Sequence, residues 1–259
     1  MTDTTSHPID TASQGASTGM LSAEFYKLRA HRTPLAIFAV VLLGVLAPSA
    51  VLAFYTPDSA TAYNDIWTTV FELLGPLTAI VFGSWLIGTE YKQGTLKRML
   101  TTEPRRARAI GAKATAGVVA TVAGLATVAV TGFGAAWLVG NLNDTAVTWD
   151  SRQILAAIFT SLVSAAIGFA LSTVTRNAAF GMVAGIGMLL VFDPLLSLIP
   201  TVGDYTLGSV LGIVDSAISG TESAFETASL ATSTAVITLG AWMALLGGAA
   251  ARLFMSRDV

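Results

Sequence analysis

The sequence of 259 residues contains no cysteine and only two histidines, His7 and His31, which both precede the first long apolar segment. The absence of cysteine excludes disulfides, thiolate nucleophiles and cysteine-ligated metals. Charged residues make up 12% of the chain, against about a quarter in an average soluble domain. So few charges cannot cover a water-exposed surface, and we expect lipid to solvate most of it. The net charge of −2 also argues against a nucleic-acid partner.

Familiar catalytic and nucleotide-binding motifs are absent as well. The sequence has no G-x-x-x-x-G-K-[ST] phosphate loop, no H-E-x-x-H zinc motif and no G-x-S-x-G nucleophile motif. No histidine falls within an apolar segment, where a metal site or general base would need one. We therefore predict no catalytic residue, no metal and no cofactor bound by this chain.

What the sequence does contain is long apolar segments. A helix needs about 20 apolar residues to cross the hydrocarbon layer, and six segments are long enough: 34–54, 66–88, 113–140, 153–174, 178–199 and 230–251. Pro48 and Pro76 interrupt two of them, which neighbouring helices in a bundle can tolerate. The sequence predicts an all-α integral membrane protein whose six spans occupy residues 34–251.

The segments outside the spans differ in character. Residues 1–19 are rich in Thr, Ser and Gly and are predicted to be a disordered tail. Residues 20–33 show an apolar face and a basic end, which predicts an amphipathic helix on the membrane surface. Two alternatives are a plain extension of the first span and a cleaved signal peptide, whose apolar run would be unusually long. A coupling loop at 89–112, an outer segment of short helices at 200–229 and a tail at 252–259 complete the chain.

The distribution of cations predicts the orientation. With the N-terminus inside, thirteen of the fourteen lysines and arginines lie on the cytoplasmic side, and only Arg152 lies outside. Positive charges concentrate on the cytoplasmic side of membrane proteins. Both termini are therefore predicted to be cytoplasmic in a multi-pass protein of a prokaryotic inner membrane. The second inner turn, 175–177, is short whereas the first inner loop is long, which does not favour a carrier built from inverted repeats.

The first inner loop is the most informative segment. Gly94 allows a bend where the second span ends, and Leu96, Met99 and Leu100 form an apolar ridge on a short helix that Pro104 stops. A short helix with an exposed apolar ridge is suited to a groove on another protein. The alternative is a helix that faces lipid and is anchored by basic residues in anionic headgroups.

The loop also resembles the signature of ABC-transporter permeases of the type-2 exporter family. The resemblance rests on a run that comprises Glu90, Tyr91, Gly94, Thr95, Leu96, Leu100, Thr101, Pro104, Arg105 and Arg106 and is followed by Lys113. It implies that Glu90, Gly94, Thr95, Leu96, Leu100, Pro104, Arg105 and Arg106 contact or position a separate ATPase. It also implies that ATP and Mg bind on that partner, and that the permease works as a homodimer or as a heterodimer with a similar permease. It also implies that residues 20–33 are a connecting helix and that Glu90 could pair with an arginine of the loop.

Two acids, Glu72 and Asp193, fall within predicted spans, where an ionised group costs roughly 3 kcal/mol. They are candidate residues of a translocation path for a drug, a peptide or a lipid-like substrate; hydration from the nearby outer surface is the alternative. Two other functions stay open. The chain could be a secondary transporter or channel with ion sites at these acids, or a membrane scaffold or immunity protein that transports nothing.

Overall fold

The computed structural model describes residues 21–54, 62–95, 106–221 and 230–256, and every regular element within these ranges is a helix. Six stretches of helix are long and apolar enough to cross a membrane, which confirms the predicted fold class. They are α2 (Arg32–Leu52), α3 (Ala62–Gln93), α5 (Arg106–Leu142), α6 (Ser151–Thr175), the continuous stretch α7 (Ala178–Gly187), η1 (Met188–Phe192) and α8 (Asp193–Ser197), and α10 (Thr232–Ser256). Residues 21–30 are also helical.

Two helices are much longer than the apolar segments that predicted them. α3 has 32 residues and α5 has 37, where the sequence predicts spans at 66–88 and 113–140. At 1.5 Å per residue these helices are about 48 and 55 Å long, and the hydrocarbon layer is about 30 Å thick. Their polar ends therefore extend beyond the lipid. The predicted loop 89–112 is helical up to residue 93 and again from residue 106, and the predicted tail 252–259 is helical up to residue 256.

The centre of the bundle is the pair formed by α3 and α6, which cross at small residues. A side chain at Gly83 would overlap the backbone of Ala165, and a side chain at Gly168 would overlap the backbone of Ile80. Ser84 donates a hydrogen bond of 3.1 Å to the carbonyl oxygen of Gly168 across the crossing. Small residues let helices approach closely in a membrane, where no hydrophobic force draws them together.

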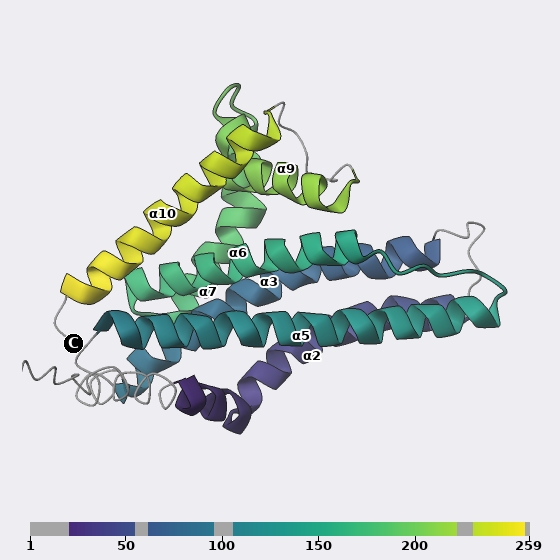
Figure 1. Ribbon diagram of the computed structural model, residues 1–259, viewed down its shortest axis with the longest axis horizontal. Helices are drawn as coiled ribbons and strands as arrows, with labels where there is room; N and C mark the ends of the chain where they lie inside the picture. The colour runs from purple at the N-terminus through teal and green to yellow at the C-terminus, as the bar shows by residue number, and fades with distance from the viewer. Residues whose placement is uncertain (1–20, 55–61, 96–105, 222–229, 257–259) are drawn as a thin grey trace, which may run out of the picture.

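Two apolar cores lie on either side of this pair. One joins α2, α3, α5 and α6 around Val45, Trp67, Phe71 and Leu125. The other joins α6 to the outer segment and to α10 through residues such as Ile167, Val210 and Leu239. Each core thus uses a different part of α6, which holds the two halves of the bundle together (Figure 1).

The outer segment contains the 3-10 turn η2 (Gly203–Tyr205) and the apolar helix α9 (Leu207–Ser219), which packs on α6, α8 and α10. The fifth span reaches it through the π-helix η1, which ends just before Asp193 and Pro194. At the opposite end of the bundle lie residues 21–30, the start of α5 and the end of α10 (Figure 1). We call this the basic end; it is the end that the sequence predicts to be cytoplasmic.

Candidate functional site

Four charged side chains meet at the basic end of the bundle, and we call them the charge cluster. Glu24 and Lys27 come from the helical segment 21–30, Glu90 from the last turn of α3, and Lys113 from the second turn of α5. These three elements are far apart in the sequence. The cluster therefore connects the N-terminal segment to the two helices that flank residues 96–105.

Lys113 lies at the middle of the cluster. Its Nζ donates to Glu24 Oε2 at 2.6 Å and to Glu90 Oε1 at 3.0 Å. Lys27 completes the arrangement, with its Nζ 2.9 Å from Glu24 Oε1 and 3.2 Å from Glu90 Oε1. Two carboxylates and two ammonium groups thus form a closed network with no net charge.

Three of the four side chains in the charge cluster are buried. The side chain of Lys113 is 2% exposed, and those of Glu24 and Glu90 are 5% and 9% exposed. Exposed ion pairs contribute little to stability, but a buried charge that loses its partner is costly. Lys27 is half-buried; burial alone would lower its pKa, but the hydrogen bond and charge of Glu24, together with the charge of Glu90, outweigh burial and raise the pKa. Lys27 is therefore held in its charged form at neutral pH.

The local sequence explains how Glu90 comes to face its partners. α3 ends at Gln93, and Gly94 follows with a φ of 65°, which favours glycine because it lies in the left-handed region. The Thr95 hydroxyl donates to Glu90 Oε2. Glu90 is thereby fixed on both oxygens, one by the lysines and one by the first residue of the connection that follows α3. A second contact, the edge-on packing of His31 against Trp85 at 6.0 Å, holds the N-terminal segment to α3.

The structure brings together three of the residues predicted to couple to an ATPase, namely Glu90, Gly94 and Thr95. Leu96, Leu100, Pro104 and Arg105 lie outside the described residues, as does the predicted tail 1–19. Arg106 begins α5, but its side chain also lies outside them. The expected charged partner of Glu90 was an arginine of the loop; the salt bridges of Glu90 among the described residues are with Lys27 and Lys113.

Sequence reasoning did not assign Glu24, Lys27 and Lys113 to the site. A signal for Lys113 was present, because a lone lysine at the start of an apolar helix needs a buried acid as its partner. Glu24 and Lys27 follow the i, i+3 spacing of a helical ion pair. Which acid each lysine would meet depends on how the three elements pack, and this cannot be read from spacing.

The two acids predicted within spans have different surroundings. Glu72 accepts a hydrogen bond of 2.9 Å from Gln153 of α6 and lies near enough to Asp215 of α9 for their charges to interact. Asp193 instead accepts from the backbone nitrogen of Gly208 at 2.8 Å and from the hydroxyl of Thr206 at 3.3 Å. Asp193 therefore caps the N-terminus of α9, whereas Glu72 belongs to a polar strip between α3, α6 and α9.

Comparison with known families agrees with this arrangement. The family described as ABC-2 family transporter protein matches residues 20–193, about two thirds of the chain. The chain belongs to the ABC-2 transporter family. No curated protein matches the sequence. The matched range begins with the N-terminal helical segment and includes all four residues of the charge cluster.

Membership of the ABC-2 family defines the general role of the chain. It is a membrane component of an ABC transporter, and such a permease acts with an ATP-binding partner subunit. The six candidate spans agree with this role. The predicted identity of the chain as a permease of this class is therefore confirmed.

Proposed function

We propose that this ABC-2 permease exports a drug, a peptide or a lipid-like molecule, using ATP and Mg bound by a separate ATPase at the basic end. The observation that carries the proposal is the charge cluster. It joins the N-terminal segment to both helices that flank the predicted coupling residues Leu96 to Arg105. A force applied to those residues by a partner would reach α3, α5 and the N-terminal segment together.

Rigid transmission requires that the three elements move as one body. The buried contacts of Lys113 provide this, because separating Glu24 from Lys113 would break a buried ion pair. The bond from Thr95 to Glu90 ties the first residue of the coupling segment to the same network. We infer that ATP-driven motion tilts α3 and α5 together, and that two permeases, identical or similar, enclose the path between them.

The polar strip offers a route for a cationic or amphipathic substrate. Glu72 and Gln153 bond across α3 and α6, and Thr160 of α6 donates to Asp215 at 2.7 Å. Gln153 and Thr160 are seven residues apart and so lie on one face of α6. An acidic strip on one face of a central helix favours a positively charged group. Asp193, the second candidate for the path, supports α9 beside this strip.

Inverted membrane vesicles from cells that express the chain with its ATPase distinguish export from ion-coupled transport. We would follow uptake of ethidium, a lipophilic cation, after addition of ATP and an uncoupler that collapses the proton gradient. Uptake that continues supports the proposal. Uptake that stops while ATP is present would identify a secondary transporter instead.

The double variant Glu72→Gln with Asp193→Asn is the matched test of the acids in the same vesicles. An ion-coupled carrier would lose transport completely, because a carboxylate must bind and release the cation in each cycle. The exporter should keep its ATP hydrolysis and lose some affinity for ethidium only, since a hydrogen bond to a charged group contributes about 1.5–3 kcal/mol.

A further inference from the structure

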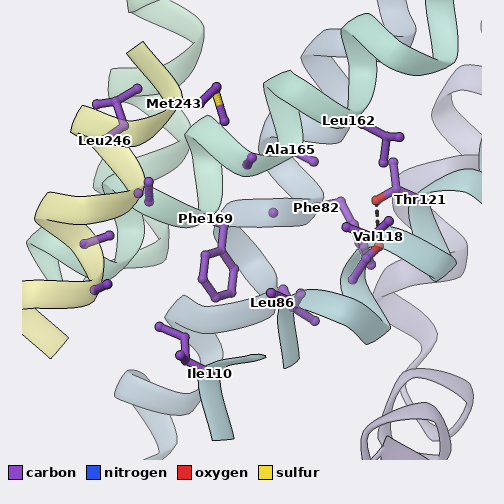
Figure 2. A pocket seen from close by; sticks show the side chains of 18 residues that line it. Phe82, Leu86, Ile110, Val118, Thr121, Leu162, Ala165, Phe169, Met243 and Leu246 are labelled. Atoms are coloured by element: carbon purple, nitrogen blue, oxygen red, sulfur yellow. Dashed lines mark hydrogen bonds between the residues drawn. The ribbon is translucent and has the colours of Figure 1, made fainter. Parts of the chain in front are cut away.

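A narrow apolar groove runs along the side of the bundle near the basic end, between α3, α5, α6 and α10. Its buried floor includes Phe82, Leu86 and Gly117, and its exposed rim includes Val118 and Gly247. Figure 2 shows the ring of Phe169 among the lining side chains, with Leu86 and Ile110 on one side and α10 on the other. The groove is thus open sideways, toward the space that lipid occupies around a membrane protein.

The lining offers a ligand almost no polar group. Thr121 carries a hydroxyl, and this already donates to the carbonyl oxygen of Gly117 in its own helix at 2.9 Å. A polar or charged molecule would lose its hydration in the groove without gaining hydrogen bonds, which is unfavourable. The occupant must therefore be apolar where it contacts the lining.

The dimensions favour a slender occupant. The cavity volume is about 190 Å³, below the roughly 300–1,000 Å³ of sites for drug-sized ligands. The lining runs from Leu162 to Ala170 on α6 and from Met243 to Ala251 on α10, which is about 12 Å of helical rise in each. A flexible hydrocarbon chain fits, and half of the hydrocarbon layer is about 15 Å deep.

Charge at the basic end indicates which lipid would be held. Arg252 is exposed and directly follows Ala251 of the lining. The nearby charge cluster is neutral as a whole, so Arg252 gives that end of the groove a positive charge. Basic residues at the membrane surface attract anionic headgroups.

We propose that the groove holds one acyl chain of an anionic phospholipid from the leaflet at the basic end, with the headgroup near Arg252. The lipid fills the gap between α10 and the α3–α5–α6 part of the bundle and joins them while the helices move. This proposal concerns a bound lipid and not the transported molecule. Its failure would therefore leave the proposed function intact.

Photo-crosslinking in lipid nanodiscs tests the proposal. The purified full chain is placed in phosphatidylcholine discs that contain a small amount of phosphatidylglycerol with a diazirine in its acyl chain, and labelled peptides are mapped by mass spectrometry. We expect labelling to concentrate on the groove residues of α5, α6 and α10. Labelling spread evenly over the exposed faces of all spans would show only the surrounding lipid and would overturn the proposal, as would crosslinks there to a second copy of the chain.

Gly247 provides a variant that fills the groove. A Cβ atom added at Gly247 or at Gly248 would meet no atom within 4 Å, so both positions have open space beside them, but only Gly247 lines the groove. Gly247→Leu should reduce groove labelling several-fold, and Gly248→Leu should leave it unchanged. Equal labelling of the two variants would contradict the proposal.

The charge of the headgroup is tested with Arg252→Gln. This variant should lower labelling by the phosphatidylglycerol probe to the level of a phosphatidylcholine probe with the same diazirine chain. If the two probes label the unaltered chain equally, the proposed selection of anionic lipid is wrong.

Discussion

At the scale of single residues, Lys113 carries the argument for coupling. Its ammonium group is buried and lies within 3.0 Å of two carboxylates from two other elements. Removing one member of a buried ion network typically costs about 3–5 kcal/mol, because the remaining charge stays buried without a partner. The position is therefore far more sensitive to substitution than the exposed cations of the same region.

The variant Lys113→Met should destabilise the protein by about 3 kcal/mol. It leaves Glu24 and Glu90 with Lys27 alone, an excess of one negative charge in a buried site. Thermal unfolding of the purified protein should begin roughly 6–12 °C lower. Lys92→Met is the matched control, because Lys92 is exposed near the end of the same α3 helix that carries Glu90. Equal midpoints for the two variants would show that the cluster does not hold the three elements together.

A double variant tests whether the net charge of the cluster determines its stability. Adding Glu24→Gln to Lys113→Met restores neutrality, because Lys27 and Glu90 then remain as a pair. Residues that share a network are not additive in their effects, and we expect the double variant to be more stable than Lys113→Met alone. A double variant that is less stable than the single one would assign Lys113 a packing role rather than an electrostatic one.

Some contacts of the charge cluster can be predicted from the sequence and others cannot. Glu90, Gly94 and Thr95 were predicted from the pattern that follows the second span, and they do meet in the structure. The contacts of Lys113 with Glu90 and Glu24 were not predicted, because Lys113 and Glu24 are 23 and 66 residues from Glu90, and only the packing of three helices brings them together. Patterns report local conformation, whereas ion partners depend on tertiary contacts.

At the scale of elements, the fifth span and the outer helix form one unit. Asp193 lies where η1 ends and α8 begins, and its carboxylate accepts from the backbone nitrogen of Gly208 in the first turn of α9. A carboxylate at this place satisfies an unpaired backbone donor and interacts favourably with the helix dipole. Any movement of the fifth span is thereby passed to α9 and to the α6 face on which α9 packs.

Replacing Asp193 by alanine should loosen α9 without unfolding the bundle. Loss of a helix cap costs about 1 kcal/mol, and we expect faster hydrogen–deuterium exchange at residues 207–211 in particular. Asp193→Asn keeps an oxygen acceptor and should exchange almost as slowly as the unaltered chain. Asp204→Ala, in the adjacent turn η2, is the control for a general effect of removing an acid. If the unaltered chain and all three variants exchange at the same rate, Asp193 does not cap α9.

The apolar segments of the sequence predict the existence of the six spans better than their lengths. All six spans were identified, because an uninterrupted run of about 20 apolar residues is typical of a membrane-spanning helix and rare in soluble domains. The extra length of α3 and α5 was not predicted, since polar residues continue these helices beyond the lipid and look like loop in a hydropathy pattern. The π-helix before Pro194 was also missed; proline removes a backbone donor, but how a helix adjusts depends on its neighbours.

At the scale of the whole molecule, the orientation of the bundle can be tested with single cysteines. The natural chain has none, so each introduced thiol is read without background. Cysteines at Asp144 and Thr221 should react with a membrane-impermeant maleimide in intact cells, and a cysteine at Arg106 should react only after the membrane is opened. Labelling of the Arg106 position from outside would reverse the orientation that the cations predict.

The association with an ATPase is the central claim, and co-purification tests it most directly. The full chain, isolated from its native membrane in mild detergent, should bring with it a polypeptide that carries a Walker A motif. Replacing Leu96 and Leu100 by aspartate should release that polypeptide, because an apolar ridge cannot dock with buried, unpaired carboxylates. Leu142→Asp, at an exposed leucine at the far end of α5, should retain it. Purification of the unaltered chain without any ATPase, or retention of the ATPase by the aspartate double variant, would contradict the account.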